Sequence, residues 1–133
     1  MSDTTTDYYY TKIIDLSPDE AEARVREELE EEGFGVLTEI DVQATLKEKL
    51  DEDMRPYKIL GACNPPYAHK ALEAEDKIGT MLPCNVIVQQ SEDGRTEVAA
   101  VDPVASMQAV SNEALRPIAK EIRDRLRRVI DRV

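Results

Sequence analysis

The sequence has few of the residues that build most recognisable chemical sites. It contains no tryptophan, one phenylalanine, one histidine and two cysteines among 133 residues. The cysteines, Cys63 and Cys84, do not form a Cys-x-x-Cys pair, and two thiols alone do not fill a tetrahedral zinc site. In an intracellular chain, two such cysteines are expected to be free thiols rather than a structural disulfide.

Long apolar runs are also absent. No stretch approaches the ~18 apolar residues of a membrane span. The first residues are polar and lack the basic, apolar leader of a signal peptide. We therefore expect a cytoplasmic protein that does not insert into a membrane.

Basic residues are outnumbered by acidic ones, 17 against 28, so the formal net charge is -11. A surface that is negative over most of its area repels the phosphate backbone of nucleic acids. The composition therefore argues against nucleic-acid binding as the main task. A length of 133 residues suits a single domain with its own core.

Local patterns predict nine alternating strands and helices. Ser17-Pro18-Asp19-Glu20 has the pattern of a capping box with proline at the first helical position, and Gly33 is suited to the helix end. Asp93-Gly94 predicts a hairpin turn. Strands are expected over residues 8–15, 36–41, 57–63, 84–90 and 95–101, and helices from residues 17, 41, 64 and 111.

Apolar stripes indicate which helix faces are buried. The spacing of Ala21, Val25 and Leu29 predicts one core face, and Val42, Leu46 and Leu50 predict another. The last helix, over residues 111–133, carries a longer stripe that Pro117 either kinks or divides. The run of glutamates over residues 27–32 is interpreted as a solvated helix face.

The element order βαβαβαββα predicts an α+β fold: a two-layer sandwich of a mixed five-stranded sheet with helices on one face. Residues 1–133 form a single domain in this prediction, with a frayed N-terminus over residues 1–6. The first and second strands are expected to be partly exposed. Because open sheet edges are usually covered or paired, we also expect a homodimer.

Three segments of the chain resemble a known family. They are Gly33-Phe34-Gly35-Val36-Leu37-Thr38-Glu39-Ile40-Asp41-Val42, Tyr57-Lys58-Ile59-Leu60-Gly61-Ala62-Cys63-Asn64-Pro65 and Leu82-Pro83-Cys84-Asn85-Val86. In this order they resemble the domain-of-unknown-function 302 family, over about residues 33–107. The resemblance implies a small, dimer-forming α+β domain of bacteria and archaea with no established biochemical role. It also implies family positions at Cys63, His69, Cys84, Asp102-Pro103 and Met107.

Cys63 is the first candidate for chemistry. It ends a predicted strand just before a helix N-terminus, where the positive end of the helix dipole favours a thiolate. The alternative is a small buried residue at a tight junction, because free cysteine is often buried. Cys84 begins another strand, so the two thiols could be neighbours. They would then be packed thiols, a redox-active pair or part of a soft-metal site.

The remaining candidates surround these thiols in the sequence. His69 lies six residues after Cys63, which places it about 9 Å along a helix, and Glu73 one turn further is its expected ion-pair partner. Met81 and Met107 could add sulfur ligands for copper, and Asn64 and Asn85 could contact a ligand. Glu39, Asp41 and Asp102 are interpreted as capping or solvated carboxylates rather than acid-base groups.

Three functions are compatible with these residues. The leading hypothesis is a dimeric module that binds either a small ligand or a metal near the two cysteines. The candidate ligand-binding residues are Cys63, Asn64, His69, Cys84 and Asn85, and the candidate metal ligands are Cys63, Cys84, Met81 and Met107. The second is a thiol-dependent enzyme or redox sensor that uses Cys63. The third is a structural or protein-interaction domain without chemistry. The sequence identifies neither the ligand nor a cofactor.

Overall fold

The structure is a computed structural model, and it describes residues 7–133. The frayed segment predicted at residues 1–6 lies outside this range. The strands are β1 (Tyr9–Ile14), β2 (Gly35–Asp41), β3 (Tyr57–Cys63), β4 (Cys84–Gln90) and β5 (Thr96–Val101). The helices are α1 (Pro18–Glu31), α2 (Val42–Leu50), α3 (Pro65–Ala74), α4 (Pro103–Ser106) and α5 (Leu115–Arg132), with the 3-10 helix η2 (Asp76–Met81).

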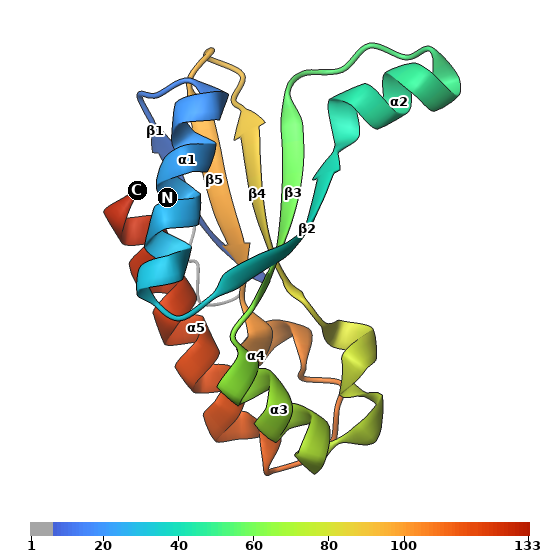
Figure 1. Cartoon of the computed structure of the whole chain (residues 1–133), viewed down its shortest axis with the longest axis vertical. Helices are drawn as coiled ribbons and strands as arrows, with labels where there is room; N and C mark the ends of the chain where they lie inside the picture. The colour runs from blue at the N-terminus through green and yellow to red at the C-terminus, as the bar shows by residue number, and fades with distance from the viewer. Residues whose placement is uncertain (1–6) are drawn as a thin grey trace.

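The five strands form one sheet in the order β1-β5-β4-β3-β2 (Figure 1). The predicted α+β class and the order of the main elements are confirmed, with η2 and α4 as short additions. The prediction of a mixed sheet is wrong, because every neighbouring pair of strands is antiparallel. The strands β1 and β2 run in the same direction, but the α1 connection carries the chain to the opposite edge, so they never pair.

α1 and α5 pack against the same face of the sheet. Ser17 and Glu20 form the predicted capping box at the start of α1, and Gly33, with a φ of 87°, follows its end. α1 buries the predicted stripe of Ala21, Val25 and Leu29. The core between the layers also contains the apolar side chains of Leu60, Val86, Val88, Val98, Ala100, Ile122, Leu126, Val129 and Ile130.

α5 begins at Leu115, four residues later than predicted. Pro117 is therefore its third residue, where the missing N–H would have no partner within the helix anyway. Residues 113–114 form a turn, so α5 begins two residues before Pro117, close to the alternative in which a helix begins there, and it continues to Arg132. No helix among residues 7–133 is long and apolar enough to cross a membrane.

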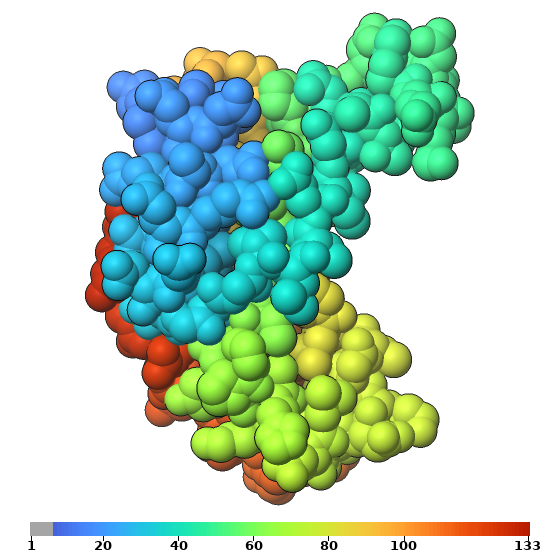
Figure 2. All heavy atoms as spheres, in the orientation of Figure 1, coloured from blue at the N-terminus to red at the C-terminus, as the bar shows by residue number. Residues whose placement is uncertain are grey.

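α2 departs from the prediction. It buries none of its residues, and Leu50 is 65% exposed, so the predicted core stripe of Val42, Leu46 and Leu50 is wrong. Figure 2 shows α2 standing away from the body of the molecule. The main contacts of α2 are with the edge strand β2 and its neighbour β3, because α1 and α5 already fill the helix layer.

Candidate functional site

The antiparallel pairing of β3 with β4 brings the two cysteines together. Ala62 pairs with Cys84, and Cys63 is the next residue of β3. Both thiols are free. The end of β3 therefore meets the beginning of β4 at the end of the sheet that lies toward α3 and the first half of α5 (Figure 1).

Cys63 and Cys84 line one cavity of about 290 Å³, which we call the two-cysteine pocket. Asn64, Tyr67 and Met107 also line it. The rest of the wall is mainly apolar and comes from β2, α3, α5 and the segments around them: Leu37, Ala62, Ala68, Ala71, Leu72, Leu82, Pro83, Pro103, Ile118, Ala119 and Ile122. A concave apolar space with a few polar groups is the usual form of a small-molecule site.

Gly61 allows the strands around this pocket to approach closely. A Cβ atom at Gly61 would collide with Oγ1 of Thr38 and lie 2.8 Å from Cγ of Pro83. A residue without a Cβ atom is therefore required at Gly61. The β2–β3 pairing also shifts register between Val36 and Thr38, so Leu37 lies at an irregularity of the strand, where it lines the pocket.

The thiol of Cys84 is held in its neutral form. Burial, together with a smaller contribution from the neighbouring Cys63, raises the pKa of Cys84 from 9.0 to about 11. A buried thiolate without a cation is costly because the low-dielectric surroundings solvate its charge poorly. Cys84 is therefore a poor nucleophile in the free protein.

The N-terminus of α3, which follows Cys63, offers fewer backbone N–H donors than most helix N-termini. Pro65 and Pro66 occupy the first two positions of α3 and carry no N–H, and the side chain of Asn64 makes no cap bond to the helix. Asn64 is therefore the N-cap residue of α3 by position, but its side chain does not bond the helix. Instead, its amide Nδ2 donates a hydrogen bond to the carbonyl oxygen of Glu32, 3.1 Å away.

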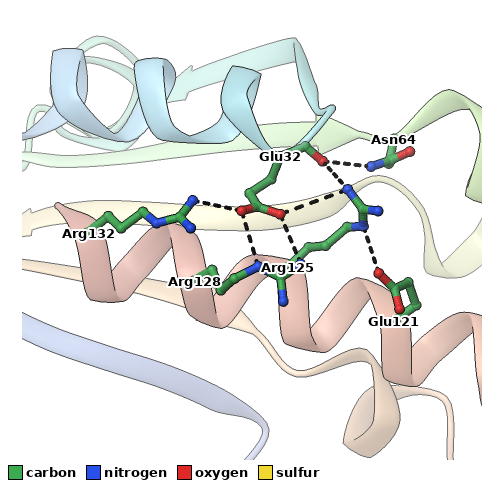
Figure 3. Close-up of polar contacts among 6 residues, drawn as sticks. All are labelled: Glu32, Asn64, Glu121, Arg125, Arg128 and Arg132. Carbon is green, nitrogen blue, oxygen red and sulfur yellow. Dashed lines mark hydrogen bonds and ion pairs between the residues drawn. The ribbon is translucent and has the colours of Figure 1, made fainter.

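Glu32 is the centre of a charged network that connects α1 to α5 (Figure 3). Its side chain is only 8% exposed. Arg128 donates to both carboxylate oxygens at 3.0 and 3.1 Å, Arg132 donates at 2.8 Å, and Nη1 of Arg125 lies 3.8 Å away. We call these four residues the arginine cluster. The hydrogen bonds from Arg128, followed by those from Arg132, hold the pKa of Glu32 below its usual value of 4.5.

The arginine cluster reaches the two-cysteine pocket through Arg125. Nη1 of Arg125 donates to the carbonyl oxygen of Glu32 at 3.0 Å, and its guanidinium lies 5.3 Å from the ring centre of Tyr67. Lys70 lies 5.4 Å from the same ring. Two cations therefore lie close to the ring of Tyr67, which also lines the pocket.

Sequence reasoning missed Glu32, which was placed on a solvated helix face. That interpretation is wrong because α5 covers the end of α1. A signal was present: four arginines, Arg125, Arg127, Arg128 and Arg132, crowd the second half of α5, and only Arg132 of these lies in the last turn, where the helix dipole favours cations. The other carboxylates behave as predicted, since Asp41 caps α2, Asp102 caps α4 and Glu39 pairs with Lys58.

The structure separates several predicted site residues from the cysteines. His69 is on the outer side of α3 with a side chain 75% exposed, and its Nδ1 lies 3.8 Å from Glu73. Asn85 follows Cys84 in β4 and therefore lies on the opposite, exposed face of the sheet. Met81 ends η2, is 37% exposed and does not line the pocket, whereas Met107 does.

Metal ligation by the common hard and borderline ligands has little support. Within residues 7–133, no group of three or more His, Cys, Asp and Glu side chains is arranged to hold a metal ion. The sulfur atoms around the pocket belong to Cys63, Cys84 and Met107. Such a soft set fits copper(I) better than zinc.

These features describe a small α+β domain with an apolar pocket at the point where β3 ends and β4 begins. The sequence matches the family described as "Domain of unknown function DUF302" over residues 10–133, so the chain belongs to the DUF302 family, as the sequence motifs indicated. A comparison with curated proteins finds no match.

A solved structure has the same fold. The uncharacterized conserved protein DUF302 from Bacillus stearothermophilus superimposes with a TM-score of 0.89 at 33% sequence identity. The match covers 95% of this chain and 98% of that chain. The likeness therefore extends over the sheet, its helix layer and the pocket end.

Proposed function

We propose that this DUF302 domain is a small-ligand-binding module and that its site is the two-cysteine pocket. The observation that carries the proposal is that Cys63, Asn64 and Cys84 line one preformed, largely apolar cavity of about 290 Å³. Apolar ligands gain affinity from removing their surface from water in such a cavity. The two thiols would contact the ligand without being consumed.

Ligand binding is favoured over thiol catalysis by the surroundings of the sulfur atoms. The pKa of Cys84 is raised to about 11 by burial, which disfavours a nucleophilic thiolate. Near Cys63, two of the first three helical residues are prolines and cannot donate to a thiolate. A thiol-dependent enzyme would instead need a thiol with a lowered pKa and N–H donors beside its thiolate.

The test is binding of N-phenyl-1-naphthylamine, a neutral apolar dye that becomes fluorescent in apolar surroundings. Saturable binding at one site is expected, with loss of binding in Ala68→Phe, because Ala68 lines the pocket and the larger ring would fill it. Ala44→Phe on the exposed α2 is the matched control and should bind like the wild type. The dye should also slow alkylation of Cys63. Absence of saturable binding, or equal binding by Ala68→Phe, contradicts the proposal.

Copper(I) binding is a second candidate, favoured by the presence of Met107 beside the two cysteines in the same lining. The metal would replace the proton of each thiol, so two protons would be released as two Cu–S bonds form. Titration of copper(I) against a competing chelator should then give one tight site that is lost in Cys63→Ser with Cys84→Ser. Equal affinity in the double variant would exclude this candidate.

The predicted homodimer is part of the same proposal. It is supported by the edge strand β2 and by α2, which present Leu37, Ile40 and Leu50 to solvent at 67%, 47% and 65% exposure. Exposed apolar groups on an open strand edge favour association. Light scattering should give twice the monomer mass, and Ile40→Glu with Leu50→Glu should give the monomer. A monomeric wild type would contradict it.

A further inference from the structure

A second cavity adjoins the two-cysteine pocket. It has a volume of about 570 Å³ and lies between α4, the segment after it and the first half of α5. Met107 and Ala119 line both cavities, so the two spaces share a wall. Met107 is an unbranched and adaptable side chain, which is suited to a wall that a ligand can displace.

The charged residues that line this second cavity are all cations: Arg116, Lys120 and Arg123. We call it the cationic pocket. In a chain with 28 acidic and 17 basic residues, an opening lined by three cations and no carboxylate departs from the charge of the whole protein. Such an opening attracts an anion.

The ion pairs that these cations already make do not prevent them from binding a ligand. Arg123 bonds Asp124 at 3.1 Å, and Arg116 lies 3.4 Å from Glu113, while both carboxylates stay outside the lining. Lys120 makes no ion pair among residues 7–133. The exposed pair of Arg116 with Glu113 is weak and exchanges readily, whereas the pair of Arg123 with Asp124 is half-buried.

The helix geometry of α5 explains why the apolar and cationic linings adjoin. At ~100° per residue, Ile118 and Ile122 lie to one side of Ala119, while Lys120 and Arg123 lie to the other. Ala119, which belongs to both linings, is the boundary between the two stripes. One turn of α5 therefore presents an apolar wall to one cavity and positive charge to the next.

We infer that the ligand is an amphipathic carboxylate, with its apolar body in the two-cysteine pocket and its carboxylate at Lys120 and Arg123. This inference rests on the proposed function and specifies the class of ligand. Arginine and lysine at the mouth of an apolar cavity recognise an anionic head while the cavity takes the chain. Met107 lies where the two parts of the ligand join.

The experiment compares decanoate with decan-1-ol, which has the same chain without the charge, by titration calorimetry on the full chain. Wild-type protein is expected to bind decanoate about tenfold more tightly than decan-1-ol, as one charge-assisted contact would give. In Lys120→Gln with Arg123→Gln, decanoate affinity should fall to that of decan-1-ol, with decan-1-ol unchanged. Lys120→Gln alone, at an exposed position, should give part of the loss.

A double variant with the same change in net charge is the control. Lys77→Gln with Arg95→Gln lies outside both pockets and should keep the preference for decanoate. Equal binding of the two probes by the wild type would overturn the inference and leave the proposed function in place. Persistence of the preference in Lys120→Gln with Arg123→Gln, or its loss in the control, would overturn the inference in the same way. Failure of both probes to bind would overturn the inference and the proposed function together.

Discussion

The arginine cluster and the two-cysteine pocket lie side by side, but the polar groups are hydrogen-bonded in the cluster and face a cavity in the pocket. In the cluster, both carboxylate oxygens of Glu32 accept hydrogen bonds from Arg128 and Arg132 (Figure 3). In the pocket, two free sulfur atoms face an apolar cavity of about 290 Å³. Asn64 belongs to both, because it bonds Glu32 and lines the pocket.

This difference separates a structural region from a candidate binding region. A buried charge whose hydrogen bonds are all satisfied stabilises the contact between α1 and α5 and leaves nothing for a ligand to bind. A cavity lacks neighbours for its lining atoms, so a ligand that fills it restores those contacts. Changes in the cluster are therefore expected to affect stability, and changes in the pocket to affect binding and reactivity.

The largest effect on stability is expected for Glu32→Gln. Removing the carboxylate leaves three arginines facing one another across a neutral amide, which should lower the free energy of unfolding by about 3 kcal/mol. Urea denaturation measures this change. Glu31→Gln, an exposed neighbour with the same change in charge, should stay within about 0.5 kcal/mol of the wild type. Equal stability of the two variants would refute a structural role for the cluster.

The burial of Cys84 in the pocket should slow its reaction with alkylating reagents. A pKa of about 11, against the ordinary 9.0, lowers the thiolate fraction at pH 8 by about 100-fold. In Cys63→Ala, which keeps the larger effect of burial and removes the smaller effect of Cys63, iodoacetamide should label Cys84 slowly, with a rate that still rises above pH 9. Unfolding in urea should restore fast labelling. A midpoint below pH 9 in the folded variant would contradict the burial of this thiol.

Acid should weaken the cluster before it affects the pocket. Folding lowers the pKa of Glu32 below its ordinary value of 4.5. The stabilising effect of the carboxylate is therefore complete above about pH 4.5 and is lost as the pH falls through the pKa of the folded state. The difference in stability between wild type and Glu32→Gln should shrink by up to about 1.4 kcal/mol per pH unit in that range. Denaturation series between pH 3 and 7 test this. If the difference in the free energy of unfolding stayed constant over this pH range, folding would not change the pKa of Glu32.

The smallest effect is expected for Asn64→Ala, which removes the connection between the two regions. One buried hydrogen bond to the carbonyl of Glu32 is lost, at a cost of about 1 kcal/mol. The side chain makes no cap bond to α3, so the helix itself should be unaffected. Titration of Asn64→Ala with N-phenyl-1-naphthylamine measures binding in the pocket, and urea denaturation of the same variant measures its stability. A loss above about 3 kcal/mol would show that Asn64 supports more than this single bond.

The sequence alone determined most of the local structure. The Ser17–Glu20 capping box, the positive φ of Gly33 and the buried stripe of α1 are each set by residues within one or two helical turns. The family and the α+β class also follow from the order of these local patterns. The prediction failed for α2 because an apolar stripe is buried only if another element covers it, and no pattern within residues 41–50 encodes that.

The candidate site was decided by tertiary structure. Cys63 and Cys84 share a cavity because Ala62 pairs with Cys84 in the β3–β4 register, and His69 and Asn85 are excluded by the helix and strand faces on which they lie. Glu32 meets Arg128 and Arg132 across 96 and 100 residues of chain. Local propensities act over a few residues, whereas strand register and helix packing depend on the burial of the whole core, so only the folded chain brings these groups together.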